Sequence, residues 1–414
     1  MKNKQPKFFY GYVIVAAAFC AMTIAWGANR SFGVFLEPML SEFGWTRAGI
    51  SGAYTLGMII MGFFSIISGR LADRFGSRVV VIGSGIFIGA GYLLISQVNT
   101  MWQLYLFYGV LTGIGMSGTF TPLLSTVAHW FVKRRGLMSS IIIAGPALGI
   151  AVMPLVASLI ISDYGWRTSY LVLGGVVLTG IVGAAMFLRR NPRELGLLPY
   201  GSIREEPDGA DLPLGGLSLR EAVHTRQFWL LFLVNFGELF LMNIITVHIV
   251  IHAIGLGVPA ISAAGILTVA AGVSIPARVI VGLIADRIGY KPGLIICFVM
   301  SIMAFVLLLV VREAWALYLF AVIFGFGLWS SGALMAPITA ELFGLKSHAT
   351  ILGCVCFAGA LGGAIGPVLA GYIFDVTGNY QLAFILCLAV SVVSLISLIL
   401  LKMTGVRGAS IEGQ

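Results

Sequence analysis

Charged side chains are scarce in this sequence. Asp, Glu, Lys and Arg make up only 10% of its 414 residues, whereas hydrophobic residues make up 59%. An ordinary soluble domain has about 25% charged residues, because these side chains cover its surface. The composition therefore excludes a typical water-soluble protein and indicates a chain that lies in a lipid bilayer.

Motifs for catalysis and metal binding are also missing. The sequence has no Gly-x-Ser-x-Gly elbow, no His-Glu-x-x-His, no phosphate-binding loop and no aspartate pair inside an apolar stretch. Its five cysteines lie in apolar stretches without a pairing pattern. His248 and His252 are one helical turn apart but have no third ligand nearby. We therefore predict no enzyme, no catalytic residues, no metal and no cofactor.

Long apolar stretches fill most of the chain. A bilayer core about 30 Å thick needs about 20 apolar residues in a helix, so the sequence predicts an all-α integral membrane protein. The first stretch is too long for a cleavable signal peptide. We count twelve spans, at residues 9–36, 48–68, 79–97, 102–128, 137–161, 168–188, 229–254, 261–284, 293–311, 315–340, 350–374 and 382–401.

A short charged cassette occurs twice, each time between two apolar spans. This repetition indicates two similar halves in parallel. The glycines permit a tight turn, and the Asp/Arg couple can bind helix ends and change partners as a gate. The copies are Gly69, Leu71, Ala72, Asp73, Arg74, Gly76 and Arg78, and then Gly282, Ile284, Ala285, Asp286, Arg287, Gly289 and Lys291. This layout resembles the cytoplasmic signature of the major facilitator superfamily.

The halves are expected at residues 1–188 and 229–414. The polar segment between them, 189–228, carries four prolines, several glycines and mixed charges, and is predicted to be a linker. The net charge of +9 does not indicate nucleic acid, because most of the bases fall on one side of the spans. The other side keeps only Arg47, Arg167 and Arg312. By the positive-inside rule, both termini are then cytoplasmic.

Of the ionisable residues within the spans, four matter most: Arg30, Glu238, His248 and Arg278. A charge at a span's centre costs about 2.5 to 3.5 kcal/mol, so each is a functional candidate. Arg30 is close enough to a span end to snorkel, whereas Arg278 lies deeper, beside Pro276. Glu238 and His248 share an arc of about 80°, although Glu238 also fits a packing carboxylate. A guanidinium binds a carboxylate through two parallel hydrogen bonds, which favours a small organic anion.

The segment Trp130, Phe131, Val132, Lys133, Arg134, Arg135, Gly136 and Leu137 resembles the second signature of the monocarboxylate transporter family. Tyr10, Gly11 and Tyr12 are similar to the first signature but lack its acidic residue. The resemblance implies that Arg278 holds the substrate carboxylate and that Arg30 is the cation used on span one. Members often have an aspartate where this chain has Ser274, so Glu238 or His248 would have to carry the coupled proton.

We therefore predict a proton-coupled secondary transporter for a short monocarboxylate such as lactate, monomeric and multi-pass in a bacterial inner membrane. The alternative is an organic-anion exchanger of the oxalate/formate type. A third possibility is a membrane sensor or enzyme, but it would need a soluble output domain or a catalytic constellation, and the sequence shows neither. The predicted partners are the substrate, protons and lipid. The predicted substrate-binding residues are Arg278, His248, Asn29, Arg30, Ser117, Trp329 and Phe357, with proton coupling at His248 and Glu238 and gating at Asp73, Arg74, Asp286 and Arg287.

Overall fold

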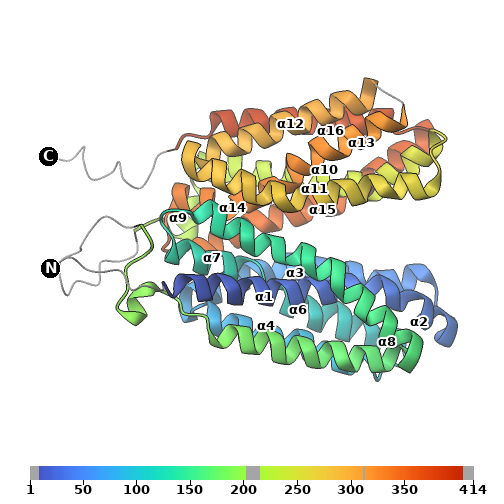
Figure 1. Ribbon diagram of the computed structural model, residues 1–414, viewed down its shortest axis with the longest axis horizontal. Coiled ribbons are helices and arrows are strands. Elements are labelled where there is room, and N and C mark those ends of the chain that lie inside the picture. Colours follow the sequence, from blue (N-terminus) through green and yellow to red (C-terminus); the bar gives the residue numbers. More distant parts are fainter. Residues whose placement is uncertain (1–8, 202–214, 311–312, 404–414) are drawn as a thin grey trace. The chain divides into compact units, whose positions relative to one another are not determined.

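The protein is built from long helices, as Figure 1 shows. The computed structural model describes residues 9–201, 215–310 and 313–403, and within these ranges the only β-structure is a pair of isolated bridges. Many large apolar side chains are exposed, among them Leu155, Leu159 and Val368. An exposed apolar surface of this extent is unfavourable in water and suits a helix that faces lipid tails.

The described residues form two compact units. The first comprises 9–133 and 141–201, together with His348–Gly353; the second comprises 134–140, 215–347 and 354–403, apart from the two undescribed residues 311 and 312. The helices that lie mainly in the first unit are α1 (Gly11–Arg30), η1 (Ser31–Phe35), α2 (Leu36–Phe43), α3 (Arg47–Phe75), α4 (Ser77–Ile95), α5 (Met101–Leu104), η2 (Tyr105–Thr112), α6 (Gly113–Ser117), α7 (Thr121–Trp130), α8 (Arg135–Met186) and η3 (Pro192–Leu195).

The second unit holds the remaining helices. They are α9 (Leu219–Val223), α10 (Arg226–Gly255), α11 (Ala260–Ile288), α12 (Tyr290–Val310), α13 (Ala314–Phe326), α14 (Leu328–Phe343), α15 (His348–Thr377, whose first residues belong to the first unit) and α16 (Gln381–Leu400). The predicted boundaries of the halves and linker stay a prediction, and residues 202–214 of that linker lie outside the described residues.

Eleven helical stretches in the described part of the chain are long and apolar enough to cross a membrane. The longest is α8, with 52 residues, and its backbone leaves helical geometry at Gly165 (φ 81°, ψ 163°). The segments on either side of this break match the predicted spans at 137–161 and 168–188. The all-α fold is therefore confirmed, and the break in α8 divides the eleven stretches into the twelve segments that were predicted.

Two predicted spans are broken rather than continuous. The stretch expected at 102–128 consists of α5, the π-helix η2, α6 and α7, and the stretch expected at 315–340 divides at Gly327 into α13 and α14. A Cβ at Gly327 would lie 2.9 Å from the Met300 Cβ and 3.0 Å from the Cys297 carbonyl. Glycine therefore lets the chain bend where it packs closely against α12.

Each charged cassette forms a one-residue turn, as its glycines predict. Gly76 joins α3 to α4 with φ +87°, and Gly289 joins α11 to α12 with φ +98°. Side chains are strongly disfavoured at such positive φ values, which explains the glycine at the same place in both copies.

The two described ends of the linker segment are held by equivalent contacts. Tyr200 pairs with Phe131 in the loop between α7 and α8, and Gly216 pairs with Gly344 in the loop between α14 and α15. Backbone hydrogen bonds support each bridge, from the Val132 N–H to the Tyr200 carbonyl and from the Leu217 N–H to the Phe343 carbonyl. Each described end is therefore tied to its own unit.

Candidate functional site

Arg278 is positioned on α11, two residues after Pro276, which lies inside the helix. Proline removes one backbone hydrogen bond and loosens the helix locally. The Arg278 side chain is half-buried, and its Nε–H donates a hydrogen bond of 3.1 Å to the Trp329 carbonyl at the start of α14. Ser274, one turn earlier, donates its hydroxyl to the Ala271 carbonyl at 2.8 Å. The guanidinium is thus oriented by a helix start that follows the Gly327 break.

Glu238 lies near the middle of α10, and its side chain is only 3% exposed. Its carboxylate accepts hydrogen bonds from the Ser331 hydroxyl at 2.7 Å and from the Asn235 Nδ2 at 3.3 Å. A Cβ on Gly332 would lie 3.3 Å from the Glu238 Oε1, so α14 presents a glycine where the carboxylate approaches it. The carboxylate and Arg278 interact electrostatically. Glu238 is therefore the nearby acidic partner that balances the half-buried cation.

Aromatic and amide groups beside this pair have unused hydrogen-bonding capacity. The Trp329 ring is half-buried and meets the Phe324 ring edge-on at 6.3 Å. Its indole Nε1 and the Asn235 Oδ1 are buried and have no hydrogen-bond partner among the described residues. Buried polar atoms nearly always have a partner, so these two atoms suit a bound ligand or water. Phe357 is half-buried on α15, in the same unit.

His248 is held within the protein through both of its ring nitrogens. Its Nε2 lies 2.9 Å from the Pro367 carbonyl, and its Nδ1 lies 3.0 Å from the Tyr380 hydroxyl. Because a carbonyl only accepts hydrogen bonds, Nε2 carries a hydrogen. His252 packs edge-on against Phe384, with ring centroids 4.8 Å apart. A substrate could contact a His248 nitrogen only by displacing one of these partners.

The predicted residues of the first unit form a different kind of cluster. Asn29 is buried at the end of α1, where its Nδ2 donates to the Tyr108 hydroxyl at 3.3 Å and its carbonyl accepts from that hydroxyl at 3.1 Å. Arg30 follows directly, is exposed, and interacts electrostatically with Tyr108. Tyr108 also packs against Phe32, with ring centroids 4.4 Å apart. Arg30 therefore borders an aromatic cluster.

Ser117 is placed elsewhere in the first unit. It lies nine residues beyond Tyr108, about two and a half helical turns along the fourth span. Its hydroxyl donates to the Ile114 carbonyl at 2.6 Å, and its own carbonyl accepts from Ser68 at 2.9 Å. Ser68 directly precedes the first cassette, so Ser117 lies toward that end of the span and is not brought together with Asn29 and Arg30.

The aspartates of both cassettes bind the first turn of a helix. Asp73 accepts from the backbone N–H groups of Ala349 and Thr350 at 3.1 and 2.8 Å, within the first unit. Asp286 accepts from the N–H groups of Gly136 and Leu137 at 2.7 and 2.9 Å, within the second. A carboxylate satisfies such N–H groups and complements the positive helix end. The arginines that follow, Arg74 and Arg287, are exposed.

Sequence reasoning missed Asn235, Ser331 and Tyr108. Asn235 stands three residues before Glu238, a spacing that places two helical side chains on one face. Ser331 and Tyr108 belong to the two broken spans and carry no comparable signal, because their contacts depend on how the helices pack.

Comparison with known proteins finds one matching family model and several similar transporters. The sequence model of the Major Facilitator Superfamily matches residues 15–335 and 275–412. Monocarboxylate transporter 13 of Bos taurus is 29% identical over 391 residues, which cover 93% of this chain and 87% of that protein. Monocarboxylate transporter 2 of Rattus norvegicus is 25% identical, covering 92% of this chain and 80% of that protein. These relatives are transporters rather than enzymes.

A solved structure shows the same fold. The crystal structure of FucP, a Major Facilitator Superfamily transporter in the outward conformation, matches with a TM-score of 0.72 and 15% sequence identity, covering 95% of this chain and 100% of FucP. The identity is too low to carry more than the fold.

Proposed function

The chain belongs to the major facilitator superfamily, and from that premise we propose that this multi-pass secondary transporter carries a short monocarboxylate, such as lactate, together with a proton. The observation that carries the proposal is the half-buried Arg278, oriented by the Trp329 carbonyl and balanced by the buried Glu238. The names of the related monocarboxylate transporters support the same substrate class.

The substrate carboxylate would bind the Arg278 guanidinium. The planar guanidinium can donate two parallel N–H hydrogen bonds to the two oxygens of a carboxylate, and it stays charged when partly buried. The indole N–H of Trp329, which has no hydrogen-bond partner among the described residues, would be a further donor for the carboxylate or a hydroxyl. The Trp329 and Phe357 rings would enclose the short carbon chain, which favours a small, largely apolar acid over a sugar.

Charge balance supports Glu238 as the residue that carries the proton. With no substrate, the Glu238 carboxylate compensates the Arg278 cation. An arriving anion would leave one negative charge in excess, and an uncompensated charge within the spans is costly. Protonation of Glu238 removes that excess and releases Arg278 for the substrate. Glu238 is a buried carboxylate that interacts with Arg278, whereas position 274, one turn before Arg278, holds a serine.

We propose Glu238 rather than His248 for this role because of their surroundings. Both nitrogens of His248 are engaged by Pro367 and Tyr380, so the ring suits a bridge between α10, α15 and the start of α16. His248 also lies ten residues beyond Glu238 along α10, about three helical turns. It is therefore a structural residue in this proposal.

The remaining parts of the transport cycle are also proposals. Residues 1–188 and 229–414 would form the alternating halves, connected by the linker 189–228. Asp73 and Asp286 would hold and release helix starts as the halves rock. One chain supplies both units, so a monomer would suffice, and the one-sided bases support cytoplasmic termini. The bacterial inner membrane stays a prediction, since the relatives named above are mammalian.

Uptake into proteoliposomes tests the proposal. We expect labelled lactate to enter faster under an inward proton gradient, and unlabelled pyruvate to compete, whereas lactamide, which lacks the carboxylate, does not. Lactate uptake that ignores the gradient but requires an anion on the opposite side would favour the oxalate/formate type of exchange. Equal competition by lactamide would contradict carboxylate recognition.

A further inference from the structure

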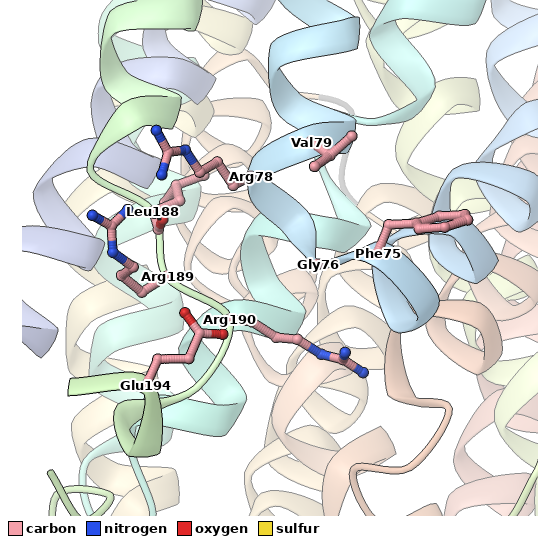
Figure 2. Close-up of a pocket in the computed structure, with 8 residues that line it drawn as sticks. All are labelled: Phe75, Gly76, Arg78, Val79, Leu188, Arg189, Arg190 and Glu194. Atoms are coloured by element: carbon pink, nitrogen blue, oxygen red, sulfur yellow. Dashed lines mark hydrogen bonds between the residues drawn. The ribbon is translucent and has the colours of Figure 1, made fainter. Parts of the chain in front are cut away.

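A pocket of about 360 Å³ lies in the first unit, where the first cassette meets the end of α8. By volume it holds about twelve water molecules, enough for a phosphate group and the glycerol attached to it. It is found at the ends of membrane-spanning helices, on the side that carries most of the bases. Figure 2 shows its lining residues, Phe75, Gly76, Arg78, Val79, Leu188, Arg189, Arg190 and Glu194.

Three arginines and one carboxylate give the pocket a positive lining. The guanidinium groups of Arg78 and Arg189 lie on the same side in Figure 2, whereas Arg190 points the other way. Arg190 donates to the Asp73 carbonyl, and Arg189 donates through one terminal nitrogen, Nη1, to the Met186 and Leu188 carbonyls, both at 3.2 Å. Arg78 is exposed. Even with Glu194 charged, the lining keeps a positive excess that favours an anion.

The start of α4 adds to this preference. Gly76, Arg78 and Val79 all line the pocket, and the first two are the N-cap and second residues of the helix. The N-cap is a glycine without a side-chain cap, and the Ser77 hydroxyl donates instead to the Pro122 carbonyl at 3.0 Å. The backbone N–H groups of a helix start and its positive dipole end suit a phosphate.

The rest of the pocket lining includes exposed apolar side chains. The side chains of Phe75 and Val79 are 55% and 59% exposed, and Phe187, next to Leu188, is 55% exposed. These residues lie at or next to the ends of helices that are long and apolar enough to cross a membrane, where exposed apolar side chains suit contact with acyl chains. A free phosphate ion has no apolar part that could contact these side chains. A phospholipid does, because its acyl chains are attached to the phosphate through the glycerol.

We propose that this pocket binds the phosphate of an anionic glycerophospholipid, such as phosphatidylglycerol, with Arg78 and Arg189 on the phosphate and the acyl chains against Phe75 and Val79. Basic pockets between membrane helices suit anionic head groups. The second cassette does not offer the same group. Its corresponding base, Lys291, donates to the Ile399 and Leu401 carbonyls at the end of α16.

Native mass spectrometry of the full-length protein, delipidated in detergent, tests the site. Phosphatidylglycerol is titrated against the wild type, against the double variant Arg78→Gln/Arg189→Gln, and against Arg70→Gln/Arg220→Gln. The latter removes the same charge from two exposed arginines outside the pocket. At about 1 kcal/mol for each base, we expect the pocket variant to bind about 30-fold more weakly and the control to bind like the wild type. Thermal unfolding in phosphatidylcholine checks that both variants fold.

Two further titrations separate the possible sources of the phosphate. Phosphatidylcholine with the same acyl chains should bind more weakly than phosphatidylglycerol, and inorganic phosphate at millimolar concentration should leave phosphatidylglycerol bound. Equal affinity of the pocket variant and the wild type would overturn the proposal. Complete displacement by inorganic phosphate would also overturn it, because the site would then take the free ion.

Discussion

The two units keep the same cassette but differ in the charges that their spans hold. In both, a glycine with positive φ makes the turn and an aspartate accepts two backbone N–H groups from a helix start. Among the described residues, only the second unit places a buried acid, Glu238, near a half-buried cation within the spans, Arg278. The first unit has the exposed Arg30 beside an aromatic cluster. Backbone requirements have thus kept the duplicated parts alike, while the charged chemistry is concentrated in one unit.

Arg278 provides the strongest test of this asymmetry. Arg278→Lys keeps the charge but loses the planar fork, and hydrogen bonds to charged groups contribute about 1.5 to 3 kcal/mol. We expect lactate uptake to fall about 10- to 100-fold in proteoliposomes that contain equal amounts of protein. Arg30→Lys, the same substitution at the exposed arginine, is the matched control and should transport nearly normally. Equal losses in both variants would remove the distinction between the units.

Glu238→Gln tests the other half of the charged pair. The amide keeps the shape and a hydrogen bond to Ser331 but can no longer take up a proton. Without substrate, the Arg278 cation would then have no compensating charge. Moving such an unbalanced charge costs at least about 1.4 kcal/mol, so uptake driven by an inward proton gradient should fall about tenfold. Lactate–lactate exchange should remain measurable.

The matched control for Glu238 is His248→Gln. It changes the other candidate proton carrier and should retain the response to the proton gradient. If the response survived in Glu238→Gln and vanished in His248→Gln, the proton would belong to His248.

The cassettes should respond symmetrically. In Asp73→Asn and Asp286→Asn the amide oxygen can still accept one of the two hydrogen bonds from the helix start, so each variant loses about one bond, which contributes about 0.5 to 1.5 kcal/mol. We expect uptake to fall about 3- to 10-fold in each variant. Arg74→Gln and Arg287→Gln alter the adjacent exposed arginines and should have little effect. A loss confined to one aspartate, or to the arginines, would break the symmetry that the hydrogen bonds indicate.

Arg30→Gln should give the smallest effect. Interactions of exposed charges are commonly about 0.2 to 1 kcal/mol, so we expect at most about a fivefold loss of uptake. A substantially larger loss, with normal folding, would show that Arg30 binds substrate and that the charged chemistry is shared between the units.

The membrane fold and the cassette turns could be predicted from sequence because each depends on local rules. Apolar length predicts a span, and the glycines at 76 and 289 predict a turn that other residues cannot easily make. The breaks in the fourth and tenth spans could not be predicted, since Gly118 and Gly327 look like the packing glycines around them. Gly115 and Gly325 pack just as closely against a neighbouring helix and yet lie inside a helix, so no local pattern shows which glycine marks the break.

The candidate site was predictable only in part for a similar reason. Arg278 and Glu238 stand out because charges are rare in spans. Their partners, Ser331 and the Trp329 carbonyl, are ordinary features that become informative only when α10, α11 and α14 pack together. His248 shows the opposite case. A histidine in a span suggests a proton carrier, but its contacts with Pro367 and Tyr380 favour a structural role.

The central claim is that an anion binds at Arg278 together with a proton on Glu238. Calorimetry of lactate binding to the wild-type protein, in two buffers of different ionisation enthalpy at the same pH, measures the protons taken up during binding. At a pH where Glu238 is ionised in the unbound protein, the account predicts about one proton for each lactate bound, as charge neutrality requires. If lactate bound without proton uptake at every pH measured, the account would be contradicted.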